Sequence, residues 1–299
     1  MHLGNARTFF VNWLLARQNG WKILLRIEDL DGPRIKAGAD RELIEDLRWL
    51  GLDWDGPPIY QSSRVNLYQQ AIAKLVESKQ AYACVCTRRE AALAASAPHS
   101  EDRTAIYSGR CRGRFISPEE ARRQTGRPAA IRFLVPNETI TFVDELLGEK
   151  RFDMSRELGD FVIAKADGTP AYQLAVVVDD ADMGVTEVVR GDDLLDSTPR
   201  QLLLYRALRL EANRPRYWHL PLVVGPDGRR LAKRHGDTRL SAYRQAGVRP
   251  ERIMALLGRW CGIKGQVNSA AEMLGRFQLA AMPRERIVFM ERDEAFLRG

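Results

Sequence analysis

Long hydrophobic runs and targeting signals are missing from this sequence of 299 residues. It contains no run of about eighteen apolar residues, the length that crosses a bilayer, and no leader with a charged start and an apolar middle. Cysteine is scarce as well. Four cysteines, three of them close together, fit a reducing compartment and a metal site better than a disulfide framework. We therefore expect a cytoplasmic protein with no membrane partner. A monomer is the state that we expect, although these absences do not bear on it.

The residues that are present are enough for a substantial core, because 45% are hydrophobic. This length predicts two units of ordinary size, one of them with an insertion. The formal net charge of +7 is unevenly spread. Residues 84–136 hold ten Arg or Lys against five acids, and residues 229–299 hold fifteen against seven. Two basic segments around an acidic remainder indicate a nucleic acid held at two places; the alternative is a set of solvated Arg-rich helix faces.

The most basic stretch is Arg229–Asp237, which follows the apolar run 220–224 and the turn 225–228. We expect the run to be a buried strand that the turn ends. Four cations then fall within six residues, and such a density repels itself unless a polyanion lies opposite. A phosphate chain is the partner we expect. The alternative is a basic turn in water.

Strands and helices alternate in the first part of the chain. We expect a strand at 21–27 that ends in Glu28 and Asp29, a helix capped by Asp40, and another helix at 65–76. Such alternation predicts a parallel sheet, with carboxylates at the ends of strands where ligands bind. One of these acids could pair with a substrate ammonium.

The same pattern returns after residue 168. The apolar runs 171–178 and 185–189 are expected to be strands covered on both faces, the first followed by acids and the second by Arg190. Arg190 is placed to donate two parallel hydrogen bonds to a carboxylate. Ser197 or Thr198 is expected to cap a helix that runs to Leu208. Beyond the basic stretch we expect helices at 240–247 and 251–261, with Cys261 in the core, and an extended piece at 287–290.

Three cysteines interrupt the alternation: Cys84, Cys86 and Cys111. Zn²⁺ prefers four ligands, and the residues alone leave the fourth open between His99 and Tyr107. The other interpretation is a group of buried reduced cysteines. The surrounding segment is Arg-rich, with a short helix at 90–95 and short strands near 131–135 and 161–164. A metal would hold so loop-rich a segment in shape.

Six motifs, taken together, resemble the glutamyl-tRNA synthetase family of class I aminoacyl-tRNA synthetases over nearly the whole chain. They occur in the family's order, at residues 2–7, 26–29, 177–180, 189–195, 197–201 and 231–234. The first and last are similar to the two signatures of class I enzymes. The short length and the Cys84-x-Cys86, Tyr107-x-x-x-Cys111 spacing look like the glutamyl-queuosine tRNA(Asp) synthetase branch.

This resemblance implies an α/β fold: a Rossmann-like parallel-sheet synthetase core with a zinc-bearing insertion and a C-terminal helical subdomain. The implied divisions are residues 1–83 for the first half of the Rossmann domain, 84–168 for the insertion, 169–228 for the second half, and 229–299 for the basic loop and helices.

The resemblance also implies the site residues. His2, Gly4 and Lys233 match residues that bind ATP, which is expected to carry Mg²⁺. Glu28, Tyr172 and Arg190 match residues that hold glutamate. Cys84, Cys86, Tyr107 and Cys111 match the branch's ligands for one structural Zn²⁺.

The implied reaction joins L-glutamate and ATP into glutamyl-adenylate and passes the glutamyl group to the queuosine base at the wobble position of tRNA(Asp). One alternative is a truncated glutamyl-tRNA synthetase that charges the 3′ end of tRNA. Another is a non-catalytic tRNA-binding remnant.

The chain departs from the family pattern at its start. Met1 stands directly before His2, where the family has a strand and a loop carrying an Arg and a Ser. Without that strand, two strand edges of the sheet are expected to be exposed. We expect family-like codons in frame upstream of Met1. Asn5 and Ala232 also differ from the family's signatures.

Overall fold

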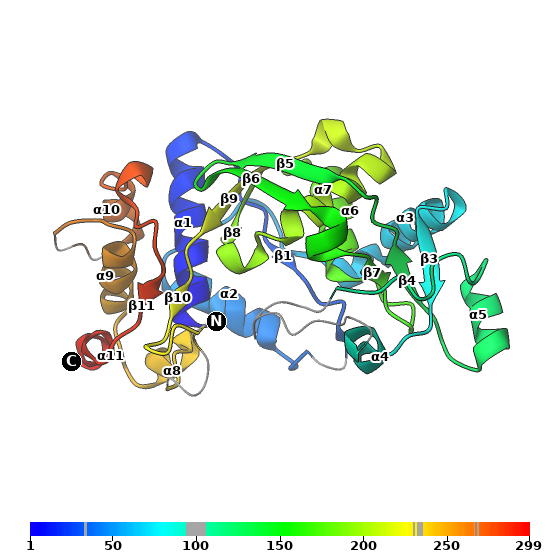
Figure 1. The fold of residues 1–299 in the computed structure, drawn as a ribbon. Coiled ribbons are helices and arrows are strands. Elements are labelled where there is room, and N and C mark those ends of the chain that lie inside the picture. The colour runs from blue at the N-terminus through cyan, green and yellow to red at the C-terminus, as the bar shows by residue number, and fades with distance from the viewer. Residues whose placement is uncertain (33–34, 94–105, 230, 232–235, 266, 268) are drawn as a thin grey trace.

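The computed structural model describes residues 1–299 except 33–34, 94–105, 230, 232–235, 266 and 268. In Figure 1 the C-terminal helices lie beside the first helix at one end, a sheet with its helices occupies the middle, and the segment that begins near residue 84 forms the other end. Among the described helices, none combines the length and the apolar character that crossing a bilayer requires.

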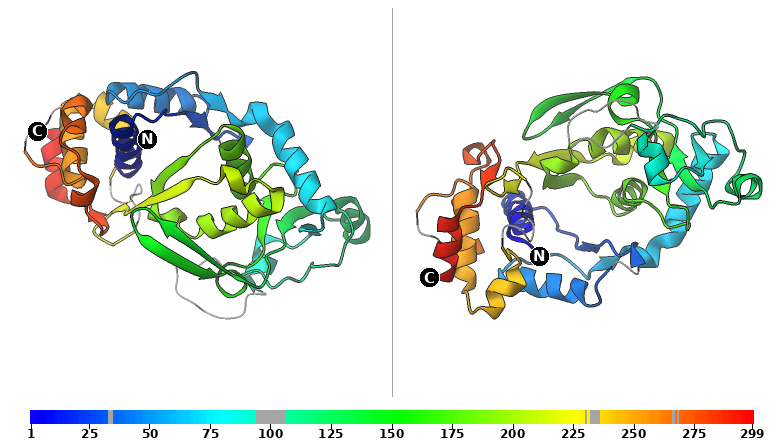
Figure 2. Two further views of the ribbon diagram at one scale, coloured as in Figure 1. Left: turned by 90° about the horizontal axis from the view of Figure 1, so that it is seen from above. Right: turned by 60° about the horizontal axis from the view of Figure 1, so that its bottom comes forward.

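The longest helix, α1 (Leu3–Asn19), lies between the central sheet and the C-terminal helices (Figure 2). It buries residues around most of its circumference, among them Leu3, Phe10 and Leu14. A helix with neighbours on two sides needs more than one apolar face, so its apolar residues do not form a single stripe. Gly20, in a left-handed conformation with φ 67°, ends the helix.

The strand predicted at 21–27 is confirmed only at its end. The structure has β1 (Arg26–Ile27), which pairs in parallel with β2 (Ile59–Tyr60). The partner segment contains Pro57 and Pro58, which have no N–H to donate, so regular pairing begins only after them. The helices of this part are α2 (Ala39–Trp49) and α3 (Val65–Glu77).

The predicted cap of α2 is wrong. Gly38, with φ 79°, is the N-cap residue, and Asp40 lies in the first turn of the helix. The Asp40 carboxylate instead accepts a hydrogen bond from the Tyr60 hydroxyl at 2.9 Å. Asp40 therefore ties α2 to β2.

The central sheet has the strand order β6-β5-β9-β8. β8 (Glu187–Gly191), β9 (Arg216–Leu220) and β5 (Thr139–Asp144) run parallel, and β6 (Gly148–Asp153) is antiparallel to β5. The sequence analysis missed the hairpin β5–β6, which lies within the range predicted as the insertion. The strand predicted at 185–189 is confirmed as β8.

The strand predicted at 171–178 is wrong: the structure has the helix α6 (Tyr172–Asp182) there. Eight consecutive residues of α6, from Leu174 to Ala181, are buried. A helix covered on all sides has a continuous apolar run, which periodicity cannot tell from a buried strand.

The helix that follows is α7 (Ser197–Leu208), with Asp196 as its N-cap residue rather than Ser197 or Thr198. The Ser197 hydroxyl instead accepts from Gln173, and the Thr198 hydroxyl accepts from Arg190. Both hydroxyls are therefore used in tertiary contacts and not as helix caps.

The cysteine-bearing region has its own antiparallel sheet, in the order β3-β4-β7. Its strands are β3 (Ala81–Cys84), β4 (Ala130–Phe133) and β7 (Phe161–Ala164). The short helices are α4 (Arg88–Leu93) and α5 (Pro118–Thr125); α5 was not predicted. The strands predicted near 131–135 and 161–164 are confirmed.

The run 220–224 predicted as one strand is divided at Pro221. Leu220 ends β9, and β10 (Val223–Val224) pairs in parallel with β11 (Ile287–Val288). The remaining helices are α8 (Leu240–Gln245), α9 (Pro250–Trp260), α10 (Ala270–Leu274) and α11 (Glu291–Arg298). Cys261 is 1% exposed, which confirms its place in the core.

Five short turns complete the described elements. Four are 3-10 turns, at Gln61–Arg64, Asp192–Leu194, Glu211–Asn213 and Leu279–Ala281, and one is a π turn at Met154–Leu158.

Candidate active site

A cavity of about 1310 Å³ lies between α1, β1, α6 and β8. Its polar lining includes Asn5, Asn12, Glu28, Tyr172, Asp180 and Arg190. In the described part of the chain, β1 pairs only with β2 and β8 only with β9, so the other edge of each strand has no strand beside it. Both strands border the cavity, but the free edge of β8 is not fully exposed, because the Val189 carbonyl accepts a hydrogen bond from Asn12 of α1 at 3.0 Å.

The three residues predicted to hold glutamate all line this cavity. Glu28 follows β1, and its side chain is 43% exposed. Tyr172, the first residue of α6, is 39% exposed, and Arg190 of β8 is 9% exposed. The structure thus brings together three side chains that are far apart in sequence. Their roles toward glutamate remain predictions.

The sequence analysis did not assign Asp180, which adds a second carboxylate to the same wall. Arg26 donates to Asp180 at 2.6 Å and contacts Glu28 at 3.4 Å. Burial raises the pKa of the Asp180 carboxyl, and the Arg26 charge opposes that rise. Two carboxylates around one guanidinium leave net negative charge on this wall, which suits a ligand ammonium. The sequence analysis noted acids after the run 171–178 but gave Asp180 no role.

Arg190 donates three hydrogen bonds to neighbouring side chains. Its Nε atom lies 3.0 Å from His219 Nε2, and its two terminal nitrogens donate to Gln201 Oε1 at 2.9 Å and to Thr198 Oγ1 at 2.8 Å. The guanidinium also lies 5.2 Å from the centre of the Tyr217 ring. These contacts fix the plane of the guanidinium before any ligand binds.

The start of α1 is fastened to the segment that follows the basic stretch. His2 Nδ1 lies 3.1 Å from Thr238 Oγ1, the Leu3 amide donates to Thr238 O at 3.0 Å, and the Leu240 amide donates to Met1 O at 2.7 Å. His2 is the N-cap residue of α1, with an extended backbone. The positive end of the helix dipole therefore lies beside Thr238.

Lys233, predicted to bind ATP, lies outside the described residues, as do 232 and 234–235. Of the described residues on either side of it, Leu231 belongs to the same core cluster as Leu3, and Thr238 contacts His2. A Cβ atom on Gly4 would meet the Val223 Cβ at 3.5 Å, which is an ordinary contact. The ATP roles of His2, Gly4 and Lys233 remain predictions.

The three clustered cysteines of the insertion have their sulfur atoms within 4.8 Å of one another. The Cys86 and Cys111 sulfurs are 3.6 Å apart, and the Tyr107 hydroxyl lies 3.4 Å from the sulfurs of both Cys84 and Cys86. Ligands about 2.3 Å from a tetrahedral zinc ion stand about 3.8 Å apart. Three thiols and one phenol therefore form one cluster that could hold a metal ion. His99, the other candidate for the fourth ligand, lies outside the described residues.

Positive charge also lies at this cluster. Arg132 Nε donates to the Cys84 sulfur at 3.3 Å, and its guanidinium stacks 4.0 Å from the centre of the Tyr107 ring. Burial raises the pKa of the Cys86 thiol to about 11. A metal would therefore have to displace protons from this site at neutral pH, and the Arg132 charge helps to offset the thiolates that result.

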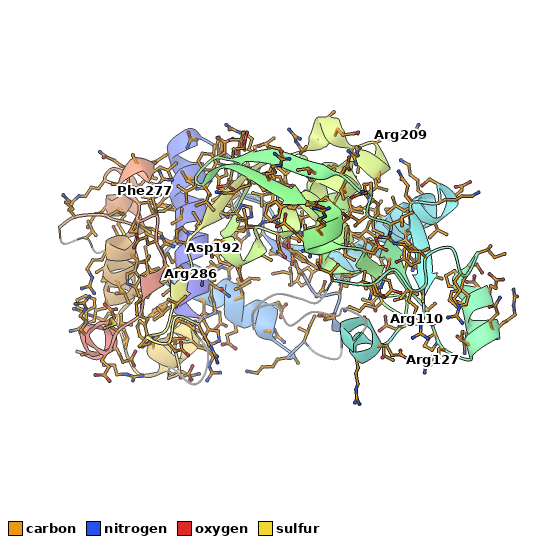
Figure 3. All side chains as sticks on the ribbon, viewed as in Figure 1. Arg110, Arg127, Asp192, Arg209, Phe277 and Arg286 are labelled. Atoms are coloured by element: carbon orange, nitrogen blue, oxygen red, sulfur yellow. The ribbon has the colours of Figure 1, made fainter. Side chains whose placement is uncertain are left out.

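The insertion carries arginines on its surface as well, and Figure 3 marks Arg110 and Arg127 there. Arg127 pairs with Glu90 at 2.9 Å, and Arg112 pairs with the buried Asp160 at 2.6 Å. Some of the basic residues of this segment therefore stabilise the insertion itself.

Comparison with known proteins places the chain among enzymes that act on tRNA. Residues 1–284 match the family described as "tRNA synthetases class I (E and Q), catalytic domain". The glutamyl-Q tRNA(Asp) synthetase of Symbiobacterium thermophilum is 46% identical over 312 residues, covering 100% of this chain and 95% of the relative. The glutamate–tRNA ligase of Geobacter sulfurreducens is 38% identical over 291 residues, covering 97% of this chain and 61% of the ligase.

Solved structures of glutamate–tRNA ligases have the same fold. That of Elizabethkingia meningosepticum, in complex with its amino acid, superposes with a TM-score of 0.80 at 28% identity, covering 99% of this chain and 66% of the ligase. The enzyme from Elizabethkingia anophelis gives a TM-score of 0.81 at 28% identity, with 99% and 67% covered. The predicted synthetase fold is confirmed by these matches.

Proposed function

Because the chain belongs to the family of class I tRNA synthetases for glutamate and glutamine, we propose that it activates L-glutamate with ATP and transfers the glutamyl group to the queuosine base of tRNA(Asp). It is a ligase of the aminoacyl-tRNA synthetase type. The observation that supports the choice of substrate is the cavity that gathers Glu28, Tyr172 and Arg190 beside α1. The cytoplasm is the compartment that we propose.

In the activation step, an α-carboxylate oxygen of glutamate attacks the α-phosphorus of ATP. A bond forms between this oxygen and the α-phosphorus. The bond between the α-phosphorus and the pyrophosphate group breaks, and pyrophosphate leaves. Arg190, with its plane already fixed, binds a glutamate carboxylate, and the wall that carries Glu28 and Asp180 receives the ammonium group. Preorganised charge of this kind stabilises a transition state without moving during the reaction.

On the nucleotide side, we assign the phosphates to the start of α1 and to the basic stretch. Backbone N–H groups at a helix N-terminus bind anions, and His2 adds a ring nitrogen at that position. Lys233 would neutralise the departing pyrophosphate, and Mg²⁺ would enter with ATP. In the second step the queuosine base takes the glutamyl group and AMP is released.

We assign a structural Zn²⁺ to Cys84, Cys86, Tyr107 and Cys111. Four protein ligands leave no position for a reactive water, so the ion would hold the insertion in shape. We further propose that the protein works as a monomer and that the basic segments 84–136 and 229–299 contact tRNA(Asp).

Charging of the tRNA 3′ end is the second candidate, because glutamate–tRNA ligases are also relatives. The queuosine reaction is favoured because the relatives named for it are more similar, at 46% identity against 38%, and match this chain over more of their own length. A tRNA-binding remnant without catalysis is the third, and the activation assay below excludes or reveals it.

Activation is tested by exchange of labelled pyrophosphate into ATP without tRNA. We expect exchange that depends on L-glutamate and not on other amino acids. Lys233→Ala should lose about 100-fold or more, because the positive charge that would stabilise the departing pyrophosphate is removed. Lys264→Ala, which changes an exposed lysine, serves as the control and should exchange like the wild type. Exchange that is equal with other amino acids would reject glutamate as the substrate.

A further inference from the structure

Behind Arg190 lies a buried pair that the site residues do not include. His219 of β9 and Asp144 at the end of β5 are 0% and 1% exposed, and His219 Nδ1 lies 2.6 Å from Asp144 Oδ2. The parallel pairing of β5 with β9 at Asp144 and Tyr217 brings the two residues together. Asp144 also accepts from the backbone amides of Leu147 at 2.8 Å and His219 at 3.1 Å. A carboxylate with this many donors is fixed in place.

The direction of the hydrogen bonds follows from the chemistry of the three groups. A guanidinium can only donate, so His219 Nε2 must accept from Arg190. The proton of the neutral ring then sits on Nδ1, where it is donated to Asp144, an ionised carboxylate that can only accept. The order Asp144, His219, Arg190 thus permits one tautomer of His219.

This arrangement leaves Arg190 ready for a ligand. Of its five N–H groups, three are bonded to His219, Gln201 and Thr198 in the described part of the chain. One N–H on each terminal nitrogen then remains for a ligand, and a guanidinium can bind a carboxylate through N–H groups of both terminal nitrogens. Arg190 lines the cavity, so these N–H groups can be reached by a ligand there.

We propose that His219 and Asp144 are positioning residues: through Nε2 of the neutral Nδ1–H tautomer, they set the plane of Arg190 and so determine the affinity for the glutamate carboxylate. This inference rests on the proposed function, because it takes Arg190 as the carboxylate-binding residue. Neither His219 nor Asp144 touches the substrate. Their action would be specific to glutamate and would leave ATP binding alone.

Protonation of His219 would break the arrangement, because an imidazolium cannot accept from Arg190. Four charged or titratable groups face the ring: Asp144 from β5, Arg190 from β8, Tyr217 from β9 and Asp192 from the turn after β8. Burial lowers the pKa of His219, and the Arg190 charge lowers it further. The hydrogen bond with Asp144 raises this pKa, but the net effect is a lowering. The neutral ring therefore persists at neutral pH, and glutamate affinity should fall only at a pH below the ordinary histidine pKa of about 6.5.

The test compares two variants that each keep half of the histidine's contacts. In His219→Gln the amide oxygen can take the place of Nε2 and accept from Arg190. In His219→Asn the amide nitrogen can take the place of Nδ1 and donate to Asp144, but no acceptor faces Arg190. In glutamate-dependent pyrophosphate exchange, we expect His219→Asn to raise the KM for glutamate by about 10- to 100-fold, and His219→Gln by less than about threefold. The KM for ATP should change by less than about twofold in both.

The pH profile separates positioning from a structural role. The wild-type KM for glutamate should rise below about pH 6.5, and this rise should be absent in His219→Gln. Equal effects of the two variants on the KM for glutamate, or equal effects on glutamate and ATP, would overturn the proposal. So would a wild-type pH profile that His219→Gln retains.

A measurement that does not depend on catalysis tests the positioning role of His219 separately from the proposed function. Nitrogen-15 NMR of histidine-labelled wild-type protein should show His219 as the neutral Nδ1–H tautomer at pH 6.5, and in Arg190→Ala the pKa of this ring should rise. The Nε2–H tautomer, or an unchanged pKa in Arg190→Ala, would contradict the positioning role. Absence of glutamate-dependent exchange in the wild type would instead contradict the proposed function.

Discussion

Arg190 has to meet two demands at once: it must be held rigidly by the protein and must still offer N–H groups to a ligand. Planar geometry makes this possible, since three N–H groups can bond to the protein and two can point elsewhere. Lysine cannot do the same, because its three donors radiate from one atom. The type of cation at this position therefore matters as much as its charge.

This argument predicts the effect of Arg190→Lys. The ammonium would leave acceptors on His219, Thr198 and Gln201 without donors and could not bind a carboxylate with two hydrogen bonds. We expect the KM for glutamate in pyrophosphate exchange to rise by about 100-fold, corresponding to a few kcal/mol, with the KM for ATP unchanged. Arg206→Lys, on the exposed part of α7, is the control. A glutamate KM equal to that of the control would show that Arg190 does not bind the substrate.

Single side chains were predicted from the sequence to differing degrees. Glu28, Tyr172 and Arg190 were named because each matches a residue that holds glutamate in the family, and all three line one cavity in the structure. His219 was not singled out, because nothing near it in the sequence marks it. Its partners, Asp144 and Arg190, are contributed by other strands, and only the pairing of β5, β9 and β8 brings them together. A buried network of this kind has no local signal.

Among the elements, α1 connects the ends of the chain through a buried arginine. Arg7 is 1% exposed, and it donates to Trp260 O at 3.2 Å and to Pro221 O at 2.6 Å. One side chain thus joins the helix that begins at His2 to α9 and to the segment that leads into the basic stretch. Arg7 therefore helps to hold the start of α1 against both.

Arg7→Met should destabilise the protein strongly. The carbonyl groups of Trp260 and Pro221 would lose their hydrogen-bond donor, and at least one of these carbonyls lies inside the protein. We therefore expect the free energy of unfolding, measured with urea, to fall by about 2–4 kcal/mol. Arg17→Met, near the other end of α1, removes ion pairs to the more exposed Asp53 and Asp55 and should cost less than about 1 kcal/mol. Equal losses in the two variants would mean that Arg7 does not hold the elements together.

The cysteine cluster of the insertion is the site to which we assign zinc. If zinc binds as proposed, purified protein should contain about one equivalent per chain, and Cys84→Ser should lose most of it. Cys261→Ser, which changes a cysteine of the core, should keep its zinc. Zinc should also leave as the pH falls, because protons compete for the thiolates and burial raises the pKa of Cys86 to about 11. Unchanged metal content in Cys84→Ser would count against the site.

Helices and strands were predicted well where apolar and polar residues alternate with a clear period, and poorly where burial removes that period from the sequence. Helices α3 and α9 show one apolar stripe each, and both were placed within a few residues, as was α8. α6 was taken for a strand because it is buried on all sides. The burial of β5 alternates along the strand, but its residue types do not follow that alternation, because Val143 is 64% exposed and Asp144 is buried. The hairpin β5–β6 was therefore missed.

Over the whole molecule, the fold brings distant segments to one region. α1 lies against β8 on one side and against α9 and α10 on the other, so the start of the chain and the residues after the basic stretch lie next to each other (Figures 1 and 2). The sequence predicted this convergence only through family motifs. Periodicity and composition cannot place residues more than 230 positions apart side by side. The divisions at 84, 169 and 229 remain predictions.

The central claim is that glutamate reaches a base of tRNA(Asp) and not its 3′ end. The direct measurement incubates the protein with labelled glutamate, ATP and queuosine-containing tRNA(Asp), then digests the tRNA with nucleases and locates the label. We expect the label on the anticodon fragment, on the queuosine nucleotide, and none when tRNA(Asp) lacks queuosine. Label on the terminal adenosine, in tRNA with or without queuosine, would contradict the account.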